Sequence, residues 1–359
     1  MDINKYMNKS MENLIGKMLK ISVKNSKELL YLGKFLKSFR KGVKLRKENE
    51  KTGEHIPYFI MASITLSCNL HCKGCYFKEN MKCNNSKENG ILTTKRWKEI
   101  FSETRDAGIN FVILLGGEPL MRKDVIEEAA KVKEIMFPIF TNGTLIDDEY
   151  TKIFKENRNL FPMISIEGKE DSTNFRRGEG VYKKIDNSMS LLFDNNILYG
   201  ASITVTKENI LEVTSEDFLD ELIIKGCVAI VYVEYVDADL KSENKVLNDL
   251  EREYLKKRVD EIRDGSKNIV VISFPGDEEK IGGCLAAGRG FFHINANGGC
   301  EPCPFSPMSD MNLKNSTVKE VLKSPFFKKI CDEELLFESH KGGCLLWEKR
   351  QEVEVLYKK

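Results

Sequence analysis

Apolar residues follow three different rhythms along the chain. Over residues 1–55 they recur every three to four positions among polar and lysine-rich residues, which is typical of amphipathic helices. From residue 58 onward, short runs rich in β-branched and aromatic residues alternate with longer helical stretches. Beyond residue 264 the alternation stops, and glycine and cysteine become frequent. The pattern predicts a helical N-terminal extension over 1–55, an α/β unit over 56–264 and a small cysteine-rich domain over 265–359.

The middle part has the pattern of repeated strand–helix units around a parallel sheet. Six such units fall short of the eight that close a TIM barrel. The expected strands are 58–66, 110–115, 137–141, 163–167, 200–206 and 228–235. The expected helices are 93–107, 123–134, 147–157, 181–195, 216–225 and 247–264.

Composition excludes several classes of protein. The formal net charge of +1 over 359 residues gives no electrostatic case for nucleic-acid binding. The chain lacks an apolar run of about 18 residues and an apolar signal-peptide core near its N-terminus, so we expect a cytoplasmic protein. The basic side chains over 34–47 offer a peripheral contact with an acidic membrane surface or a protein, although such runs are commonly solvated faces. These side chains are Lys34, Lys37, Arg40, Lys41, Lys44, Arg46 and Lys47.

The cysteines carry the strongest chemical signal. Ten cysteines gathered in groups indicate metal ligation rather than a disulfide framework in a cytosolic chain. Cys68, Cys72 and Cys75 have the spacing C-x3-C-x2-C directly after the first expected strand. Three thiols on a 4Fe-4S cluster leave one iron open for an external ligand. A structural zinc knuckle is the alternative, but it needs four ligands and no second CxxC or CxxH lies near this loop.

This cysteine spacing resembles that of the radical SAM enzymes, and the resemblance covers roughly residues 60–236. It implies a partial (β/α)6 TIM-like barrel whose open side faces the substrate. It also implies that S-adenosylmethionine (SAM) chelates the open iron through its amino and carboxylate groups, with flavodoxin or ferredoxin as electron donor. One departure from the family is Gly74, which stands where an aromatic residue commonly precedes the third cysteine, so that Tyr76 becomes the aromatic candidate for contact with SAM.

Further candidates for SAM binding follow the expected strands, where the active sites of parallel α/β folds lie. Gly116, Gly117 and Glu118 resemble the family's GGE motif, which holds the amino group of SAM. The turn 141–143 resembles the TNG sequence of many relatives. Alternation turns Ser165 and Glu167 to one side of the sheet, toward the ribose or the polar end of SAM. The remaining candidates are Arg176 or Arg177, as the partner of Glu167 or a clamp on the SAM carboxylate, and one of Thr204 and Thr206.

A second group of cysteines lies near the C-terminus, where Gly-Gly precedes a cysteine three times. Glycines permit the backbone conformations that aim N–H groups at cluster sulfurs. The four thiols of Cys284, Cys300, Cys303 and Cys344 would close one auxiliary 4Fe-4S cluster, or else a structural zinc site. This tail resembles the SPASM and twitch extensions of radical SAM enzymes, with a hairpin over 291–303. Cys331, in an expected helix over 317–332, Cys83 and Cys227 are left without a metal role.

The resemblance implies an enzyme that cleaves SAM reductively and uses the 5′-deoxyadenosyl radical to abstract hydrogen from a substrate. Relatives with SPASM-like tails often modify ribosomally made peptides or convert active-site residues of sulfatases, so a peptide or protein is the expected substrate. A radical SAM dehydrogenase acting on a small molecule is one alternative. A non-catalytic iron–sulfur electron carrier or redox sensor is another, and it would need no SAM pocket.

Overall fold

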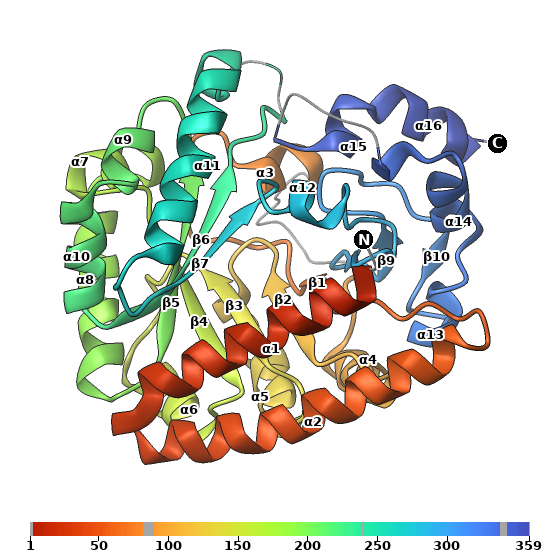
Figure 1. The fold of residues 1–359 in the computed structure, drawn as a ribbon, viewed down its shortest axis with the longest axis horizontal. Coiled ribbons are helices and arrows are strands. Elements are labelled where there is room, and N and C mark those ends of the chain that lie inside the picture. The colour runs from red at the N-terminus through yellow and green to blue at the C-terminus, as the bar shows by residue number, and fades with distance from the viewer. Residues whose placement is uncertain (1–2, 82–89, 239, 241, 338–342, 359) are drawn as a thin grey trace.

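The computed structural model describes residues 3–81, 90–238, 240, 242–337 and 343–358, so Cys83 lies outside the described residues. One ten-stranded sheet runs through the molecule in the order β10-β9-β8-β1-β2-β3-β4-β5-β6-β7 (Figure 1). The six predicted strands are confirmed with shifts of up to three residues at their ends. They are β1 (Phe59–Ser63), β2 (Phe111–Leu115), β3 (Phe137–Thr141), β4 (Leu160–Ser165), β5 (Tyr199–Val205) and β6 (Cys227–Glu234), all in parallel register.

The sheet continues beyond residue 264 in two directions. β7 (Val270–Phe274) adds in parallel to β6, and β8 (Phe291–Ile294) adds in parallel to β1. The rings of Phe274 and Phe291 meet edge to face at 6.3 Å, so these two strands approach each other through side chains. β9 (Gly299–Glu301) and β10 (Met311–Asn312) then extend the β8 edge as antiparallel strands. The region 265–359 therefore contributes four strands to the same sheet as the six predicted strands.

Helices cover the outer face of the barrel, as predicted. Side chains such as Ile60, Ala62 and Leu114 are fully buried under them. Polar N-caps fix where several of these helices begin, for example Thr93, whose hydroxyl accepts the N–H of Arg96. The helices are α4 (Thr94–Asp106), α5 (Lys123–Lys131), α6 (Asp148–Glu156), α8 (Val181–Asp194), α10 (Glu216–Ile224) and α11 (Asp249–Asp264), with shorter helices α3 (Tyr76–Met81), η2 (Pro119–Met121), α7 (Glu170–Arg177), α9 (Ile210–Val213) and η3 (Glu243–Lys245) at strand ends and in loops.

The two N-terminal helices, α1 (Ile3–Ile21) and α2 (Ser26–Glu50), are joined by η1 (Ser22–Lys24) and lie across the end of the barrel where the strands begin (Figure 1). Phe35 is buried there and packs edge to face on Phe111, the first residue of β2. Arg46 is also buried and donates to the carbonyl of Gly108, 2.6 Å away, so it does not belong to an exposed basic face as expected. The other six basic side chains of that run are exposed. Among the described residues, no helix combines the length and apolar character that crossing a membrane requires.

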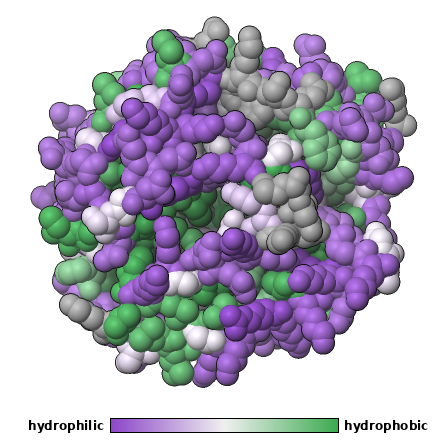
Figure 2. All heavy atoms as spheres, in the orientation of Figure 1, coloured by the Kyte–Doolittle hydropathy of each residue, from purple (hydrophilic) through white to green (hydrophobic). Residues whose placement is uncertain are grey.

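The C-terminal region packs beside the first strands. Its helices are α12 (Glu278–Ile281), α13 (Val318–Val321), α14 (Pro325–Asp332), η4 (Leu335–Phe337), α15 (Leu345–Glu348) and α16 (Arg350–Lys358). The single helix expected over 317–332 is two helices, because Pro325 begins a new one after Ser324. Figure 2 shows mostly hydrophilic side chains over one face of the molecule, with a hollow near its middle in which apolar side chains are visible.

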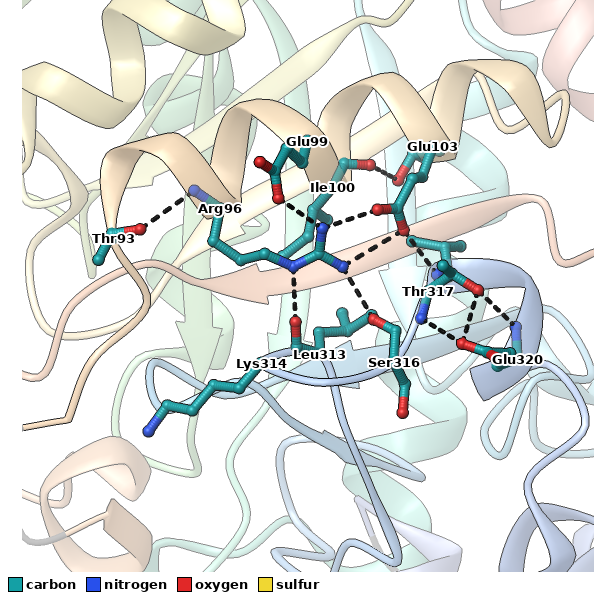
Figure 3. A network of polar contacts seen from close by, with 12 residues as sticks. Thr93, Arg96, Glu99, Ile100, Glu103, Leu313, Lys314, Ser316, Thr317 and Glu320 are labelled. Atoms are coloured by element: carbon teal, nitrogen blue, oxygen red, sulfur yellow. Dashed lines mark hydrogen bonds and ion pairs between the residues drawn. The ribbon is translucent and has the colours of Figure 1, made fainter.

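Arg96 of α4 connects this region to the barrel (Figure 3). Its guanidinium donates to the carbonyl of Leu313 at 2.6 Å and to that of Ser316 at 2.8 Å. Glu103, further along the same helix, pairs with Arg96 and accepts the N–H of Val318 at 2.8 Å. Charged groups on a barrel helix thus hold the backbone that leads from β10 into α13.

Candidate active site

The loop that follows β1 carries the first cysteine group. Cys68, Cys72 and Cys75 are half-buried free thiols, and Cys68 interacts electrostatically with both of the others. The N–H of Leu70 donates to the sulfur of Cys68 at 3.4 Å. Burial raises the pKa of the Cys68 thiol to about 12. Because a coordinating metal deprotonates a thiol outright, bound iron would hold this sulfur as the thiolate at neutral pH.

Gly116 and Gly117 directly follow β2 and lie against this loop. A Cβ atom on Gly116 would lie 2.6 Å from the carbonyl oxygen of Thr65, and one on Gly117 would lie 2.1 Å from that of Ser67. The N–H of Gly117 donates to Thr65 at 3.0 Å, and the N–H of Glu118 donates to Ser67 at 2.8 Å. The glycines therefore permit a close backbone approach, and the backbone they approach is that of the cysteine loop.

The carboxylate of Glu118 is buried at the centre of a hydrogen-bond network. Its Oε1 accepts the N–H of Leu120 at 3.0 Å and the hydroxyl of Thr141 at 2.6 Å, and its Oε2 accepts the N–H of Asn142 at 2.8 Å. Asn142 also donates through its side chain to Asn69 of the cysteine loop. Burial raises the pKa of Glu118 despite these hydrogen bonds. Since a carboxylate has about four acceptor positions, three donors leave room on Oε2 for one more.

Glu167 lies just past β4 and takes both candidate arginines as partners. Arg176 approaches Oε1 at 2.6 Å, and Arg177 binds both carboxylate oxygens. Burial alone would raise the pKa of Glu167, but the charges of Arg177 and Arg176 outweigh it and lower that pKa. Arg177 reaches further, with Nη1 4.0 Å from the sulfur of Cys72, while the backbone N–H of Lys73 donates to Arg176 at 2.9 Å. Both arginines thus hold α7 against the cysteine loop.

The remaining candidates occupy different places. Ser165 pairs with Ser202 across β4 and β5, so Ser165 and Thr204 lie on the same face of the sheet, and both are half-buried. Thr206 lies beyond the end of β5 and its hydroxyl is hydrogen-bonded to Asn209 at 3.2 Å. Tyr76 packs on Phe305 of the C-terminal region with 4.9 Å between ring centroids. Of the two threonines, Thr204 is the one that lies within β5 on the same face of the sheet as Ser165.

An open groove runs along the outside of the cysteine loop, between that loop and α7. Its volume is about 840 Å³, and its walls include Asn69, Lys73 and Phe175. Tyr235, which follows β6, also lies against the cysteine loop. A Cβ atom on Gly74 would be 2.7 Å from the hydroxyl oxygen of Tyr235. Gly74 also has a φ of +64°, a left-handed conformation that favours glycine. The glycine at this departure from the family pattern therefore leaves space for Tyr235, which sequence reasoning did not identify.

The structure brings together three of the four predicted C-terminal thiols. Cys284, Cys303 and Cys344 are buried, the thiols of Cys303 and Cys344 are hydrogen-bonded, and Cys284 interacts electrostatically with both. Cys300 lies on β9, where its sulfur is 3.7 Å from the carbonyl of Gly298. The groups acting on its thiol are the Leu313 N–H, Glu301 and Asp310, so the structure does not place Cys300 with the other three.

Two other thiols make backbone contacts. The sulfur of Cys331 faces the carbonyl of Ala287 at 3.9 Å, and that of Cys227 faces Ala229 at 3.2 Å. Within the described part of the chain, no three His, Cys, Asp or Glu side chains stand close enough together to hold a single metal ion. The C-terminal thiol group is therefore defined by its pairwise contacts.

Comparison with known families identifies the core. The family model described as the Radical SAM superfamily matches residues 62–221, the span that holds the cysteine loop, Glu118 and Glu167. The chain contains a radical SAM domain. It is therefore a radical SAM enzyme, and membership implies SAM and a 4Fe-4S cluster as cofactors.

Several curated proteins resemble this radical SAM enzyme in sequence. The AdoMet-dependent heme synthase of Methanosarcina barkeri is 26% identical over 317 residues, which cover 80% of this chain and 87% of that protein. The Fe-coproporphyrin III synthase of the same organism is 27% identical over 64% of this chain and 59% of its own length. Molybdenum cofactor biosynthesis protein 1 of Dictyostelium discoideum is 29% identical over 72% of this chain. This radical SAM chain spans 43% of that last protein, so it matches only part of some relatives.

Solved structures share the fold of this radical SAM enzyme. Streptococcus suis SuiB bound to precursor peptide SuiA superposes with a TM-score of 0.64 at 19% identity, covering 81% of this chain and 70% of that one. Native anSMEcpe with bound AdoMet and Cp18Cys peptide gives 0.61 at 19% identity, covering 79% and 84%. The superposed share is larger than the span 56–264, so the likeness reaches beyond the barrel.

The loop residues of the radical SAM core fit a cluster with three protein ligands. The three thiols interact with one another, none is in a disulfide, and a backbone N–H already points at one sulfur. Thiolates are the ligands of iron–sulfur clusters, and N–H donors to sulfur are their usual supports. The donor set and its surroundings therefore suit the cofactor that the family implies.

Sequence reasoning missed a buried set of polar contacts that links β1, β8 and β9. Ser63 of β1 is hydrogen-bonded to His293 of β8 at 2.8 Å, and the other ring nitrogen of His293 is 2.7 Å from Glu301 of β9. Asn295 donates to the second oxygen of Glu301 at 2.6 Å. His293 and Asn295 alternate along one expected strand, and this was the available signal. The pairing of β8 with β1 was not foreseen, so the partnership with Ser63 could not be read from sequence.

Proposed function

We propose that the chain cleaves SAM reductively at a 4Fe-4S cluster held by Cys68, Cys72 and Cys75 and abstracts a hydrogen atom from a peptide or protein substrate. The observation that carries this proposal is the convergence of three free thiols at the end of β1, beside Glu118 and Arg177. When bound, the cluster supplies the electron that splits SAM into methionine and a 5′-deoxyadenosyl radical. The loop, α7 and the ends of β2 and β3 would hold this assembly in place.

Each nearby side chain has a distinct part in the proposal. Glu118 would accept a hydrogen bond from the SAM ammonium at its remaining acceptor position. Arg177 would place positive charge beside the cluster, because its guanidinium already contacts Cys72. Arg176 would position the loop through Lys73. Ser165, Thr204 and Tyr76 are the polar groups left to meet the ribose and adenine, and a flavodoxin or ferredoxin would deliver the electron.

The domain division follows from these roles. We propose that 56–264 is the catalytic barrel, that 1–55 closes the end where its strands begin, and that 265–359 holds an auxiliary 4Fe-4S cluster. The thiols of Cys284, Cys303 and Cys344 support the auxiliary cluster, since they are buried together and act on one another. A structural zinc ion is the alternative occupant, as four-ligand thiolate sites suit both metals.

A peptide substrate is favoured by likeness of fold. SuiB was solved with a precursor peptide and anSMEcpe with a Cp18Cys peptide, and both superpose on about 80% of this chain. The sporulation killing factor maturation protein SkfB of Bacillus subtilis is also 25% identical over 45% of this chain. Modification of a ribosomal peptide or maturation of a sulfatase would both fit this substrate class.

A small-molecule substrate is the second candidate, and one observation favours it. The heme synthase of Methanosarcina barkeri matches across 87% of its own length, more than any peptide-related protein named above. A tetrapyrrole substrate would explain that extent of similarity. An oxidised small-molecule product would place the chain among dehydrogenases.

The test begins with reduction by dithionite in the presence of SAM under anaerobic conditions. Production of 5′-deoxyadenosine is expected from the intact chain and is expected to be lost when Cys72 is replaced by alanine. Cys331→Ala is a matched control, because the sulfur of Cys331 faces the backbone carbonyl of Ala287 and has no metal role in this proposal. Incubation with peptides encoded beside the gene, and separately with Fe-coproporphyrin III, then asks which one changes mass. A protein that binds iron yet forms no 5′-deoxyadenosine would contradict the proposal.

A further inference from the structure

Glu278, the first residue of α12, is an unusual neighbour for the C-terminal thiols. Its side chain is 4% exposed, and its carboxyl group is hydrogen-bonded to the thiol of Cys284. The N–H of Leu285 donates to its Oε1 at 3.3 Å. Within the residues that the structure describes, no Lys, Arg or His forms an ion pair with Glu278. Buried carboxylates are ordinarily paired with a cation or bound to a metal.

The nearest cation is committed to other groups. Arg289 acts on Glu278 electrostatically, but its guanidinium donates to the carbonyls of Gly283 and Cys284 at 2.9 and 2.7 Å. Its other terminal nitrogen donates to the carbonyl of Ile281 at 3.0 Å. Arg289 therefore braces the turn that carries Cys284 and leaves the carboxylate beside the thiols.

The turn after α12 fixes Glu278 and Cys284 side by side. Gly282 and Gly283 both have positive φ, and a Cβ atom on Gly283 would lie 2.2 Å from the carbonyl oxygen of Leu336. The N–H of Gly283 donates back to the carbonyl of Glu278 at 3.0 Å, and the N–H of Cys284 donates to Leu336 at 2.8 Å. The first of the three Gly-Gly-Cys sequences thus turns the chain back, so that Gly283 contacts Glu278.

Cys300, the fourth cysteine expected from sequence, is held elsewhere. It pairs with Ile294 on one side and Met311 on the other, within the antiparallel part of the sheet. The thiol of Cys300 faces the carbonyl of Gly298, and the following residue, Glu301, is hydrogen-bonded to His293. Moving this sulfur to the other thiols would require β9 to leave its register.

We infer that Glu278 supplies the fourth ligand of the C-terminal cluster, through a carboxylate oxygen, and that Cys300 is a structural thiol. This inference rests on the auxiliary cluster proposed above. Coordination forms one iron–oxygen bond, and the proton shared between Glu278 and Cys284 leaves to solvent as both groups bind as anions. A cluster with three thiolates and one carboxylate would differ in spectrum and stability from one with four thiolates.

The experiment uses the full chain with Cys68, Cys72 and Cys75 all replaced by alanine, so that only the C-terminal cluster contributes. After anaerobic reconstitution we expect about four irons and four sulfides per chain. Adding Cys303→Ala should remove most of this iron, whereas adding Cys300→Ala should leave it unchanged. Cys300→Ala that loses iron as Cys303→Ala does would overturn the assignment.

Glu278→Gln is the decisive variant, and Glu279→Gln is its matched control on the exposed side of the same short helix. Glu278→Gln keeps an acceptor for Leu285, and we expect folding by circular dichroism to be retained. We expect its cluster to lose iron to a chelator at least about tenfold faster. We also expect the Mössbauer signal of one distinct iron site to change, with Glu279→Gln like the parent.

Two outcomes distinguish a failure of the Glu278 assignment from a failure of the auxiliary cluster itself. Parent-like chelation and Mössbauer signals in Glu278→Gln would refute the ligand while leaving the auxiliary cluster intact. A parent that binds one zinc ion and no iron would overturn the auxiliary cluster and, with it, the role of Glu278 toward iron. Glu278→Cys provides a gain-of-function check, since a four-thiolate spectrum is expected from it.

Discussion

Removing the carboxylate of Glu167 tests how the catalytic loop is held. Glu167→Gln would leave Arg177, whose side chain is 9% exposed, without its counter-charge. Arg176 is 16% exposed and can turn toward the groove, so the loss falls mainly on Arg177. Breaking a buried ion pair by removing one partner costs about 3 to 5 kcal/mol. We therefore expect the free energy of unfolding to fall by about 3 kcal/mol at neutral pH.

The pH dependence follows from the lowered pKa of Glu167. A carboxylate with a depressed folded pKa stabilises the fold above its unfolded pKa of about 4.3 and loses that contribution as pH falls through the folded pKa. The difference between wild type and Glu167→Gln should thus be full at pH 7 and shrink below about pH 4.

The assay is urea unfolding under anaerobic conditions, followed by far-ultraviolet circular dichroism and tryptophan fluorescence. Glu170→Gln is the control, because Glu170 is exposed in the first turn of α7. Adding Arg177→Gln to Glu167→Gln should cost less than the sum of the two single changes, since the uncompensated charge is gone. A loss below about 1 kcal/mol, or one that persists undiminished at pH 3, would refute the reasoning.

Three further changes give separate readouts. Gly117→Ala should prevent iron uptake at the cysteine loop, because its Cβ would lie 2.1 Å from a loop carbonyl oxygen, whereas Gly33→Ala, with nothing within 4 Å, should not. Arg96→Ala should speed proteolysis after β10 while Lys98→Ala, on the exposed side of the same helix, should leave the rate unchanged; equal rates would contradict the tether seen in Figure 3. Glu118→Gln should weaken SAM binding by roughly tenfold, measured from the reduced cluster's EPR signal, and unchanged affinity would show that its carboxylate serves only the turn.

The strands and long helices were predictable because burial imposes periodicity on them. β4, for example, is buried at five successive positions, and α5 carries Val125, Ile126 and Ala129 on one face. α7 was missed because only Thr173 among its residues is buried, and its place is set by ion pairs with Glu167. The pairing of β7 with β6 and of β8 with β1 was missed, because an apolar run in the sequence does not reveal which strand is its partner.

The site shows the same division between local and long-range information. Spacing alone pointed to Cys68, Cys72 and Cys75, and these thiols interact with one another on the loop after β1. Cys300 and Cys303 are equally plausible ligands in sequence, and the register of β9 is what separates them. Glu278 could not be singled out from sequence, because it is one of four consecutive charged residues. Only the turn through Gly283 brings it to the thiols.

The parallel pairing of β1 with β8 has a consequence for synthesis of the chain. β1 is synthesised long before its partner β8, which consists of Phe291–Ile294. Until then its unpaired edge is a template for wrong pairing, and closure must bring together segments about 230 residues apart. The ribosome-bound intermediate therefore carries an incomplete barrel, and a chain truncated before residue 291 should aggregate rather than persist as a smaller folded enzyme.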